Sequence, residues 1–309
     1  MTKGFFLYLS RSERARRAIM GLPFSRRAAR RFVVGETLEE ALDAVKDLNG
    51  EGLMATLDLL GEDVTSPEEA AKSTREVASI LDGIRRTGVN SNLSLKLTQL
   101  GLRLGRELCQ KNLEFVLQRG VECGNFVRID MEGSDVTEIT LRIFEDARRR
   151  FSNVGVVVQA YLRRTEKDLR ERLIPAGAPV RLCKGAYKEP PEVAFPVKAD
   201  VDANYLRLAD LLLSAQTRGK GVRTAIATHD EAMIAHVSDK VKRGDLGKQD
   251  FEFQMLYGIR RQLQRSLAQE GYPVRIYVSY GTQWYPYFMR RLAERPANVL
   301  FLAKNVLRG

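Results

Sequence analysis

The order of apolar and amphipathic segments predicts an α/β protein, a (β/α)8 barrel of the TIM type. Eight short apolar runs, each of a length that suits a buried strand, alternate with charged amphipathic stretches of helical length. The alternation covers about 250 residues, the usual size of such a barrel. An open doubly wound sheet is the alternative, but no G-x-G-x-x-G follows a strand and opens a helix.

The expected strands are rich in β-branched and aromatic residues, as in the last run around Tyr277, which Gly281 and Thr282 end. The strands are expected at Leu53–Leu59, Asn92–Leu97, Phe126–Met131, Gly155–Ala160, Val180–Cys183, Arg223–Ala227, Asp250–Met255 and Arg275–Val278. The helices that follow them are expected at Pro67–Thr87, Gly105–Cys123, Val136–Phe151, Thr165–Glu171, Ala203–Thr217, Asp230–Lys240, Tyr257–Ala268 and Pro286–Glu294.

Two segments precede the first strand. Thr37 and Glu40 have the spacing of a capping box, which predicts a helix from about Leu38 to Leu48. Residues 1–35 are expected to form a helical N-terminal arm, and 36–309 the barrel. We see no internal repeat and no linker, so a single domain is the simplest arrangement.

The composition excludes several classes of protein. The chain has 309 residues, of which 44% are hydrophobic and 29% charged, and no apolar run is long enough to span a membrane. The three cysteines are far apart and form no CxxC, which indicates reduced thiols in a cytoplasmic compartment. Two histidines without clustered cysteines argue against a zinc site, and the carboxylates form no pattern typical of a magnesium site, so we expect no metal.

The net charge of +11 is concentrated at the start of the chain, where residues 1–31 hold nine Lys or Arg and one acid. Such a segment could contact anionic lipid or nucleic acid, or act as a transit peptide. No nucleic-acid motif is present, so we favour a helical extension that packs on the main body. Since no small-residue cleavage signal follows, we expect that this arm is not removed.

A barrel places its active site at the carboxyl ends of the strands. The polar residues expected there are Glu62, Lys96, Asp130, Glu132, Gln159, Tyr161, Arg181, Lys184, Thr228, His229, Glu252, Gln254 and Tyr277. Any one of them could be structural, for example Lys96 as the partner in a buried ion pair. Their convergence on one end of a barrel favours a binding site.

Two features indicate what the site binds. Arg290 and Arg291 lie one turn of helix after Tyr287, and paired guanidinium groups suit a small carboxylate. In RLCKGAY, the backbone of Gly185 and Ala186 can approach a phosphate closely, while Lys184 adds a point charge. Thr228 and His229 offer a second phosphate-binding pair at the next helix start. Together these features predict a small anionic substrate and a cofactor with a diphosphate.

Seven segments resemble, in order, the motifs of the proline dehydrogenase family. They are SLKLTQLG, RIDMEG, VVVQAYLRRT, RLCKGAYKEP, TAIATHD, FEFQMLYG and YFMRRLAE. The resemblance extends from about Arg31 to the C-terminus and is to the short, monofunctional bacterial form of this flavoenzyme. It implies a distorted (β/α)8 barrel that binds FAD and oxidises L-proline to Δ1-pyrroline-5-carboxylate, with electrons passed to a membrane quinone.

The resemblance also implies roles for single residues. The residues expected to bind proline are Lys96, Arg290 and Arg291 at the carboxylate and Tyr187, Leu256, Tyr277 and Tyr287 around the ring. Asp130 and Arg181 take the catalytic positions, with Arg181 beside flavin N5. The further cofactor contacts expected are Met131, Gln159, Lys184, Gly185, Ala186, Thr228 and His229. Glu62, in the LLGE motif, would pair with an arginine of the last helix as a gate over bound substrate.

The resemblance has one departure and several wider implications. Lys188 stands where the bifunctional relatives have a tryptophan near the flavin, so their redox-linked switching is not expected here. No aldehyde dehydrogenase segment follows the barrel, and the second step of proline oxidation would then need a separate pyrroline-5-carboxylate dehydrogenase. The expected location is the cytoplasm, with peripheral contact to the inner face of the cell membrane left open.

The sequence leaves two alternative functions open. A Schiff-base aldolase on the same barrel could use Lys96 or Lys184 as its amine nucleophile. A basic module that binds nucleic acid or membrane through residues 1–31 is the non-enzyme alternative, supported by composition alone.

Overall fold

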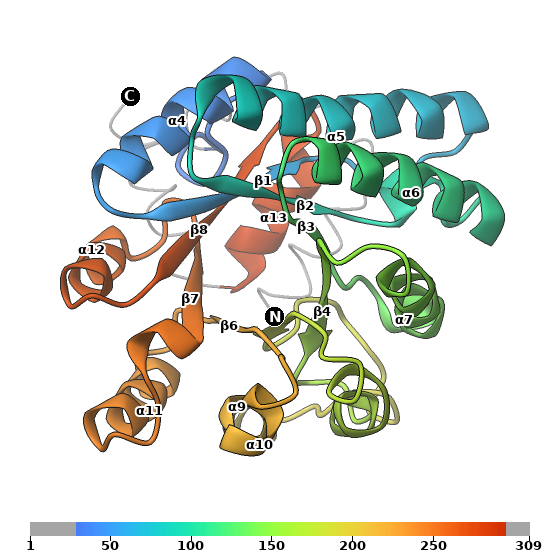
Figure 1. Ribbon diagram of the computed structural model, residues 1–309. Helices are drawn as coiled ribbons and strands as arrows, with labels where there is room; N and C mark the ends of the chain where they lie inside the picture. Colours follow the sequence, from blue (N-terminus) through green and yellow to red (C-terminus); the bar gives the residue numbers. More distant parts are fainter. Residues whose placement is uncertain (1–28, 295–309) are drawn as a thin grey trace.

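The computed structural model describes residues 29–294 of the chain. In this part, eight parallel strands form a closed barrel in which each strand pairs with its neighbours in sequence and β1 pairs with β8. Helices surround the barrel wall (Figure 1). The predicted (β/α)8 barrel is therefore confirmed.

The strands lie close to their expected positions. They are β1 Met54–Leu59, β2 Ser91–Leu95, β3 Val127–Ile129, β4 Val154–Gln159, β5 Val180–Cys183, β6 Thr224–Ala227, β7 Phe251–Leu256 and β8 Val274–Tyr280. The longest, β8, extends past its predicted end because it pairs with β1 over six consecutive residues.

The helices differ more from the prediction. They are α4 Leu38–Gly50, α5 Pro67–Thr87, α6 Arg106–Glu122, α7 Ser134–Arg148, α8 Thr165–Asp168, α9 Lys198–Leu213, α10 Ala215–Arg218, α11 Glu231–Lys242, α12 Arg261–Gln269 and α13 Trp284–Glu294. Short 3-10 turns at Thr98–Leu100 and Lys248–Asp250, and a π-helical turn at Leu169–Leu173, complete the list.

Three of the observed helices differ clearly from the expected ones. The segment 165–171 is a short α-helix that continues as the π-helical turn. The helix expected at 203–217 begins earlier, at Lys198. It is divided into α9 and α10 at Ser214, which has extended backbone and caps α10. Helix α12 begins at Arg261 and not at Tyr257, because Gly258 and Arg260 have left-handed backbone angles of φ 74° and 55°.

Residues 1–28 of the predicted N-terminal arm lie outside the described part of the chain. The described end of the arm is not a continuous helix, since Val33 forms a parallel β-bridge with Ser279 of β8 and the Val34 N–H donates to the Ser279 carbonyl at 3.1 Å. The capping box that begins α4 is present, with the Glu40 N–H on the Thr37 hydroxyl at 3.2 Å.

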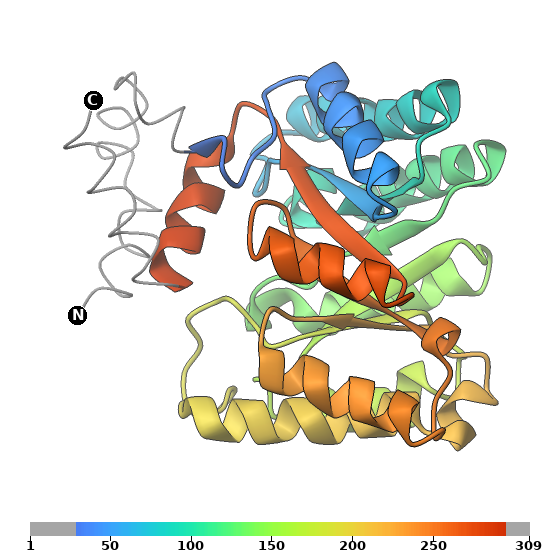
Figure 2. The ribbon, with the colours of Figure 1, turned by 90° about the vertical axis from the view of Figure 1, so that its left-hand side faces the viewer.

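The last helix has a different position from the others. Helices α4 to α12 pack on the barrel wall, whereas α13 lies at the end of the barrel where β8 finishes (Figure 2). Its buried residues, among them Trp284 and Phe288, pack with Leu60 after β1 and with Phe32 in the segment before α4. This second apolar cluster, separate from the main core, fixes α13 over the carboxyl ends of the strands.

Candidate active site

An open cavity of about 1430 Å³ lies at the carboxyl ends of the strands. Its walls come from the loops after β1, β3 and β5 and from the turn after β8. Of the residues expected at the strand ends, Glu62, Glu132, Ala186 and Tyr187 line this cavity, together with Lys188. Lys96, Asp130, Arg181 and Tyr277 do not line it. The cavity therefore opens at the expected end of the barrel, on the side of β1 and α5.

Lys96 follows β2 and forms a buried ion pair with Asp58 of the neighbouring strand β1. Its Nζ donates to Oδ1 of Asp58 at 2.9 Å, and the Asp58 side chain is completely buried. Ser279 of β8 donates to the other carboxylate oxygen at 3.3 Å. Burial opposes the charge on Lys96, but the nearby carboxylates, chiefly Asp58 and then Asp130, outweigh it and raise the Lys96 pKa. Lys96 is therefore a fixed cation and a poor amine nucleophile.

Asp130, Arg181 and Tyr277 meet in the centre of the barrel. Arg181 Nη1 donates to Asp130 Oδ1 at 2.6 Å, and the Tyr277 hydroxyl donates to Asp130 Oδ2, also at 2.6 Å. The guanidinium lies over the Tyr277 ring at 5.3 Å and donates to the Ser94 hydroxyl at 3.0 Å. Burial and the neighbouring Asp130 raise the pKa of Tyr277, so its hydroxyl keeps its proton. The three predicted residues form one preorganised unit.

Glu132 and Gln159 are tied to each other at the next two strand exits. The Gln159 side-chain amide donates to the Glu132 carbonyl at 2.9 Å. The Glu132 carboxylate accepts from the Thr98 hydroxyl at 2.5 Å and from the Thr98 N–H at 3.1 Å. Burial raises the pKa of Glu132 to about 7. The backbone of Gln159 is fixed as well, because the Thr165 hydroxyl donates to the Gln159 backbone carbonyl at 2.6 Å.

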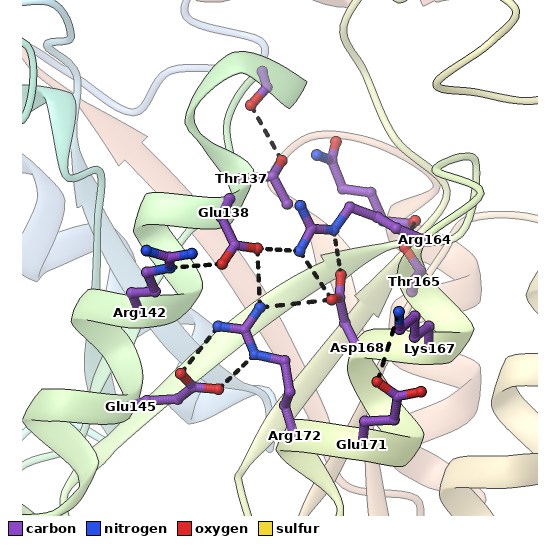
Figure 3. A network of polar contacts seen from close by, with 12 residues as sticks. Thr137, Glu138, Arg142, Glu145, Arg164, Thr165, Lys167, Asp168, Glu171 and Arg172 are labelled. Carbon is purple, nitrogen blue, oxygen red and sulfur yellow. Dashed lines mark hydrogen bonds and ion pairs between the residues drawn. The ribbon is translucent and has the colours of Figure 1, made fainter.

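An ionic network supports this side of the barrel from outside (Figure 3). Glu138 of α7 accepts from Arg164 and, at 3.1 Å, from Arg172. Arg164 also binds Asp168 at 2.7 Å. The bond from Arg164, then that from Arg142, lowers the Glu138 pKa to about 2. The network joins α7 to α8 and the π-helical turn, the segment from which Thr165 holds Gln159.

The exit of β5 contains the predicted phosphate-binding residues. Gly185 has φ 116°, and a Cβ there would lie 2.2 Å from the Tyr161 ring, so only glycine fits. Gly185 is exposed at this point, which leaves its backbone accessible. Lys184 is not a free charge: its Nζ donates to Asp202 and, at 2.7 Å, to Asp230. Asp230 in turn caps α11 through the Ala232 N–H at 3.1 Å.

Thr228 and His229 form the turn between β6 and α11. The Thr228 hydroxyl accepts from the Asp230 N–H at 3.1 Å. His229 Nε2 accepts from the Leu256 N–H at 2.8 Å, so a neutral imidazole carries its proton on Nδ1. This bond connects the turn after β6 with the end of β7, where Leu256 was expected to border the substrate.

One strand assignment is corrected by the structure. Glu252 was expected at the carboxyl end of β7, but β7 continues to Leu256 and Glu252 lies near its amino end. There its carboxylate pairs with Arg275 Nε at 3.0 Å. Gln254 lies nearer the mouth, and its buried Oε1 has no hydrogen-bond partner.

Helix α13 contributes Tyr287 and Arg291. The Arg291 guanidinium lies over the Tyr287 ring at 5.1 Å, and Tyr287 is buried. This cation–π contact fixes the direction of the arginine. The backbone of Arg290 and Glu294 belongs to α13, but their side chains lie outside the part that the structure describes.

Sequence reasoning missed Asp58, Ser94 and Thr98. All three are buried and make the polar contacts that orient Lys96, Arg181 and Glu132. A signal was present for Asp58, since it is the only charged residue in the apolar run Leu53–Leu60. A lone carboxylate in a buried strand implies a cation opposite it.

The barrel interior also carries a cation without an acidic partner. The buried Arg128 of β3 donates to the carbonyls of Pro179 at 2.7 Å and Val156 at 3.3 Å, and its Nε has no partner. Burial, and then the charge of Arg181, lowers the Arg128 pKa to about 9. Because Pro179 precedes β5, this guanidinium points toward the amino end of that strand, and the carboxylates of Glu252 and Asp130 partly oppose the shift.

The residues at this end fit a large cofactor with a phosphate. Buried polar atoms lack partners there: Arg181 Nε and Gln254 Oε1. The side chains of Met131 and Gln159 are buried at the exits of β3 and β4. Gly185 exposes its backbone where a side chain cannot be placed. Fold and site together are those of a (β/α)8-barrel enzyme whose polar groups gather at the carboxyl ends of the strands.

Comparison with known proteins agrees with that class. Residues 41–304 match the model of the family described as proline dehydrogenase. Over 308 residues, the chain is 42% identical to proline dehydrogenase 1 of Bacillus subtilis, with 100% of both chains covered. It is 41% identical to the proline dehydrogenase of Deinococcus radiodurans over 286 residues, which cover 91% of this chain and 90% of that one.

A solved structure is similar as well. Proline utilization A from Bdellovibrio bacteriovorus, inactivated by N-propargylglycine, superposes with a TM-score of 0.80 at 28% identity. The match covers 87% of this chain and 33% of that longer one. The chain belongs to the proline dehydrogenase family, and its reaction is the oxidation of proline. Among residues 29–294, no helix is long and apolar enough to cross a membrane.

Proposed function

We propose that the chain is an FAD-dependent dehydrogenase that converts L-proline to Δ1-pyrroline-5-carboxylate. The observation that carries this proposal is the Asp130–Arg181–Tyr277 unit inside the barrel, where Arg181 Nε and Gln254 Oε1 are buried without a hydrogen-bond partner. The flavin, when bound, accepts the hydride that leaves the proline carbon next to nitrogen. The protein supplies binding, orientation and electrostatics.

The substrate carboxylate is assigned to Lys96, Arg290 and Arg291. Lys96 is held as a cation by Asp58, and Arg291 is held by its contact with Tyr287. Charge-assisted contacts to a carboxylate are strong and directional. They would place the pyrrolidine ring against Tyr277, Tyr287 and Leu256, with Tyr187 at the border.

Asp130 and Arg181 are assigned to the reaction itself. The proline amine has to be neutral, so that its lone pair can assist the departure of hydride. Arg181 is a buried cation whose direction is fixed by Asp130, Ser94 and the Tyr277 ring. A cation that does not have to reorient stabilises negative charge as it develops. Asp130 keeps that cation in place.

The remaining contacts to FAD are assigned to the exits of strands β3 to β6. Met131, Gln159 and Arg181 would contact the ring system. The ribityl chain and diphosphate would be held by Lys184, Gly185, Ala186, Thr228 and His229. Lys184 would then share its charge between the phosphates and the carboxylates of Asp202 and Asp230.

Glu62 is assigned to a gate over bound proline. It lies on the loop after β1 and lines the cavity at the barrel mouth. An ion pair with an arginine of α13 would close the mouth and exclude water during the reaction. We further propose that a membrane quinone takes the electrons and that a separate dehydrogenase oxidises the pyrroline.

The test begins with the purified protein. Denaturation should release a flavin whose mass is that of FAD, and L-proline added without oxygen should bleach the visible absorbance of the bound flavin. D-proline serves as the matched control. A colourless protein that FAD cannot reconstitute would refute the proposal. The aldolase reading requires a neutral lysine, which the ion pairs of Lys96 and Lys184 disfavour.

A further inference from the structure

The loop that carries Glu62 has a strained backbone. Asp63, the next residue, has φ 55°, and it is one of two residues other than glycine with positive φ in the range 29–294. This conformation is unfavourable for most residues with a Cβ and less so for aspartate, and contacts with the surroundings help to hold it. Strain of this kind gathers at ligand clamps and moving segments.

Both the backbone and the side chain of Asp63 are held by the segment after β2. The Asp63 N–H donates to the Thr98 hydroxyl at 3.3 Å, and the next N–H, of Val64, donates to the Thr98 carbonyl at 3.4 Å. The Asp63 carboxylate binds Arg103 Nε at 2.5 Å. Arg103 also donates to Asp135, at the start of α7, at 2.9 Å.

Thr98 is itself locked in position. It is completely buried, and both its N–H and its hydroxyl donate to the Glu132 carboxylate. Because the hydroxyl proton points to Glu132, a lone pair of the hydroxyl oxygen is left to accept from Asp63. The Glu132 carboxylate therefore orients the Thr98 hydroxyl so that its oxygen can accept from the loop.

We propose that Thr98 and Arg103 are positioning residues that hold Glu62 over the barrel mouth. Thr98 fixes the backbone on the carboxyl side of Glu62, and Arg103 fixes the Asp63 side chain against α7. With both contacts, Glu62 has one position over the mouth; without them, the loop relaxes from its strained form and Glu62 moves away from bound proline. This inference rests on the proposed function, since it takes Glu62 as the gate.

The test uses Thr98→Val and Arg103→Gln in the full-length protein loaded with FAD. Thr98→Ser keeps the hydroxyl. Arg106→Gln is the matched control for Arg103, because Arg106 begins α6 and pairs with Asp146, away from the loop. The first measurement is hydrogen exchange of a peptide covering residues 60–66, without proline. The second is steady-state oxidation of proline.

In Thr98→Val and Arg103→Gln, we expect exchange of this peptide to rise about tenfold and KM for proline to rise about tenfold. FAD content and kcat of Arg103→Gln should stay near wild type, whereas Thr98→Val also removes a hydrogen bond from Glu132 and is judged by the exchange at residues 60–66. Thr98→Ser and Arg106→Gln should match wild type in both measurements. A buried structural role alone would not separate KM from kcat in this way. If Thr98→Val does not fold, Arg103→Gln, at an exposed residue, decides alone.

Two results overturn the inference. One is unchanged exchange at residues 60–66 in both variants, which means that Thr98 and Arg103 do not hold the loop. The other is faster exchange with an unchanged KM, which means that the loop position does not control proline binding. Failure of the wild-type protein to be reduced by proline is a separate outcome, and it refutes the proposed function whatever the exchange measurement shows.

Discussion

Removal of the Asp58 carboxylate should destabilise the protein more than any change at the surface. In Asp58→Ala, the Lys96 ammonium stays inside the barrel without its partner. At an effective dielectric constant of 20, the attraction between charges 2.9 Å apart is about 6 kcal/mol. Desolvation consumes part of that attraction, and loss of one partner of a buried pair costs about 3–5 kcal/mol in practice.

The assay is urea unfolding of Asp58→Ala, Lys96→Met and the double variant. We expect a loss of about 3–5 kcal/mol in the free energy of unfolding for Asp58→Ala, because a buried charge is left unpaired. The double variant contains neither charge and should recover at least half of that loss. Proline binding should be weak in all three, since Lys96 is misplaced or missing. A loss below about 1 kcal/mol in Asp58→Ala would refute the view that a buried pair positions Lys96.

Three further predictions concern the mouth and the outer network. Arg290→Ala and Arg291→Ala should each raise the Kd for proline about ten- to a hundredfold, from the loss of about 1.5–3 kcal/mol per charge-assisted contact, with the flavin retained; wild-type values would exclude the carboxylate clamp. Glu62→Ala should slow the proline-dependent phase of flavin reduction in stopped-flow more than the limiting rate; a collapse of the limiting rate alone would assign Glu62 to the chemistry. Because the folded-state pKa of Glu138 is lowered to about 2 from its ordinary value of 4.5, its contribution to stability is present above pH 4.5 and lost as the pH falls toward 2. The melting temperature of Glu138→Gln should therefore be below that of the wild type at pH 7 and closer to it at pH 3.

The fold could be predicted because the signal is repeated along the chain. Each strand of a parallel barrel is covered by a helix, so its sequence is apolar and short, and the helices between strands are long and charged. The exact bounds Val180–Cys183 and Pro67–Thr87 were predicted for this reason. Breaks such as Ser214 or the left-handed Arg260 depend on local backbone angles, which periodicity does not report.

The site could be predicted in part. Residues after a strand, such as Lys96 and Lys184, were found because strand exits can be counted. Their partners were missed: Asp58 had a signal as the lone charge in an apolar run, whereas Asp202 lies on α9, and counting strand exits does not report contacts with helices. Glu252 was assigned to the wrong end of β7 although the strand itself was predicted within one residue, because a polar residue on the strand was taken for one at its carboxyl end. The roles of these residues in catalysis stay predictions.

The most direct test of the central claim is an anaerobic titration of the FAD-loaded protein with L-proline. One equivalent of proline should bleach one equivalent of flavin and yield one equivalent of a product two hydrogen atoms lighter than proline by mass spectrometry. Arg181→Met, with FAD bound, should be reduced far more slowly at saturating proline, because the fixed cation is missing. The account is contradicted if proline leaves the flavin spectrum unchanged in wild type, or if borohydride traps substrate on Lys96 or Lys184.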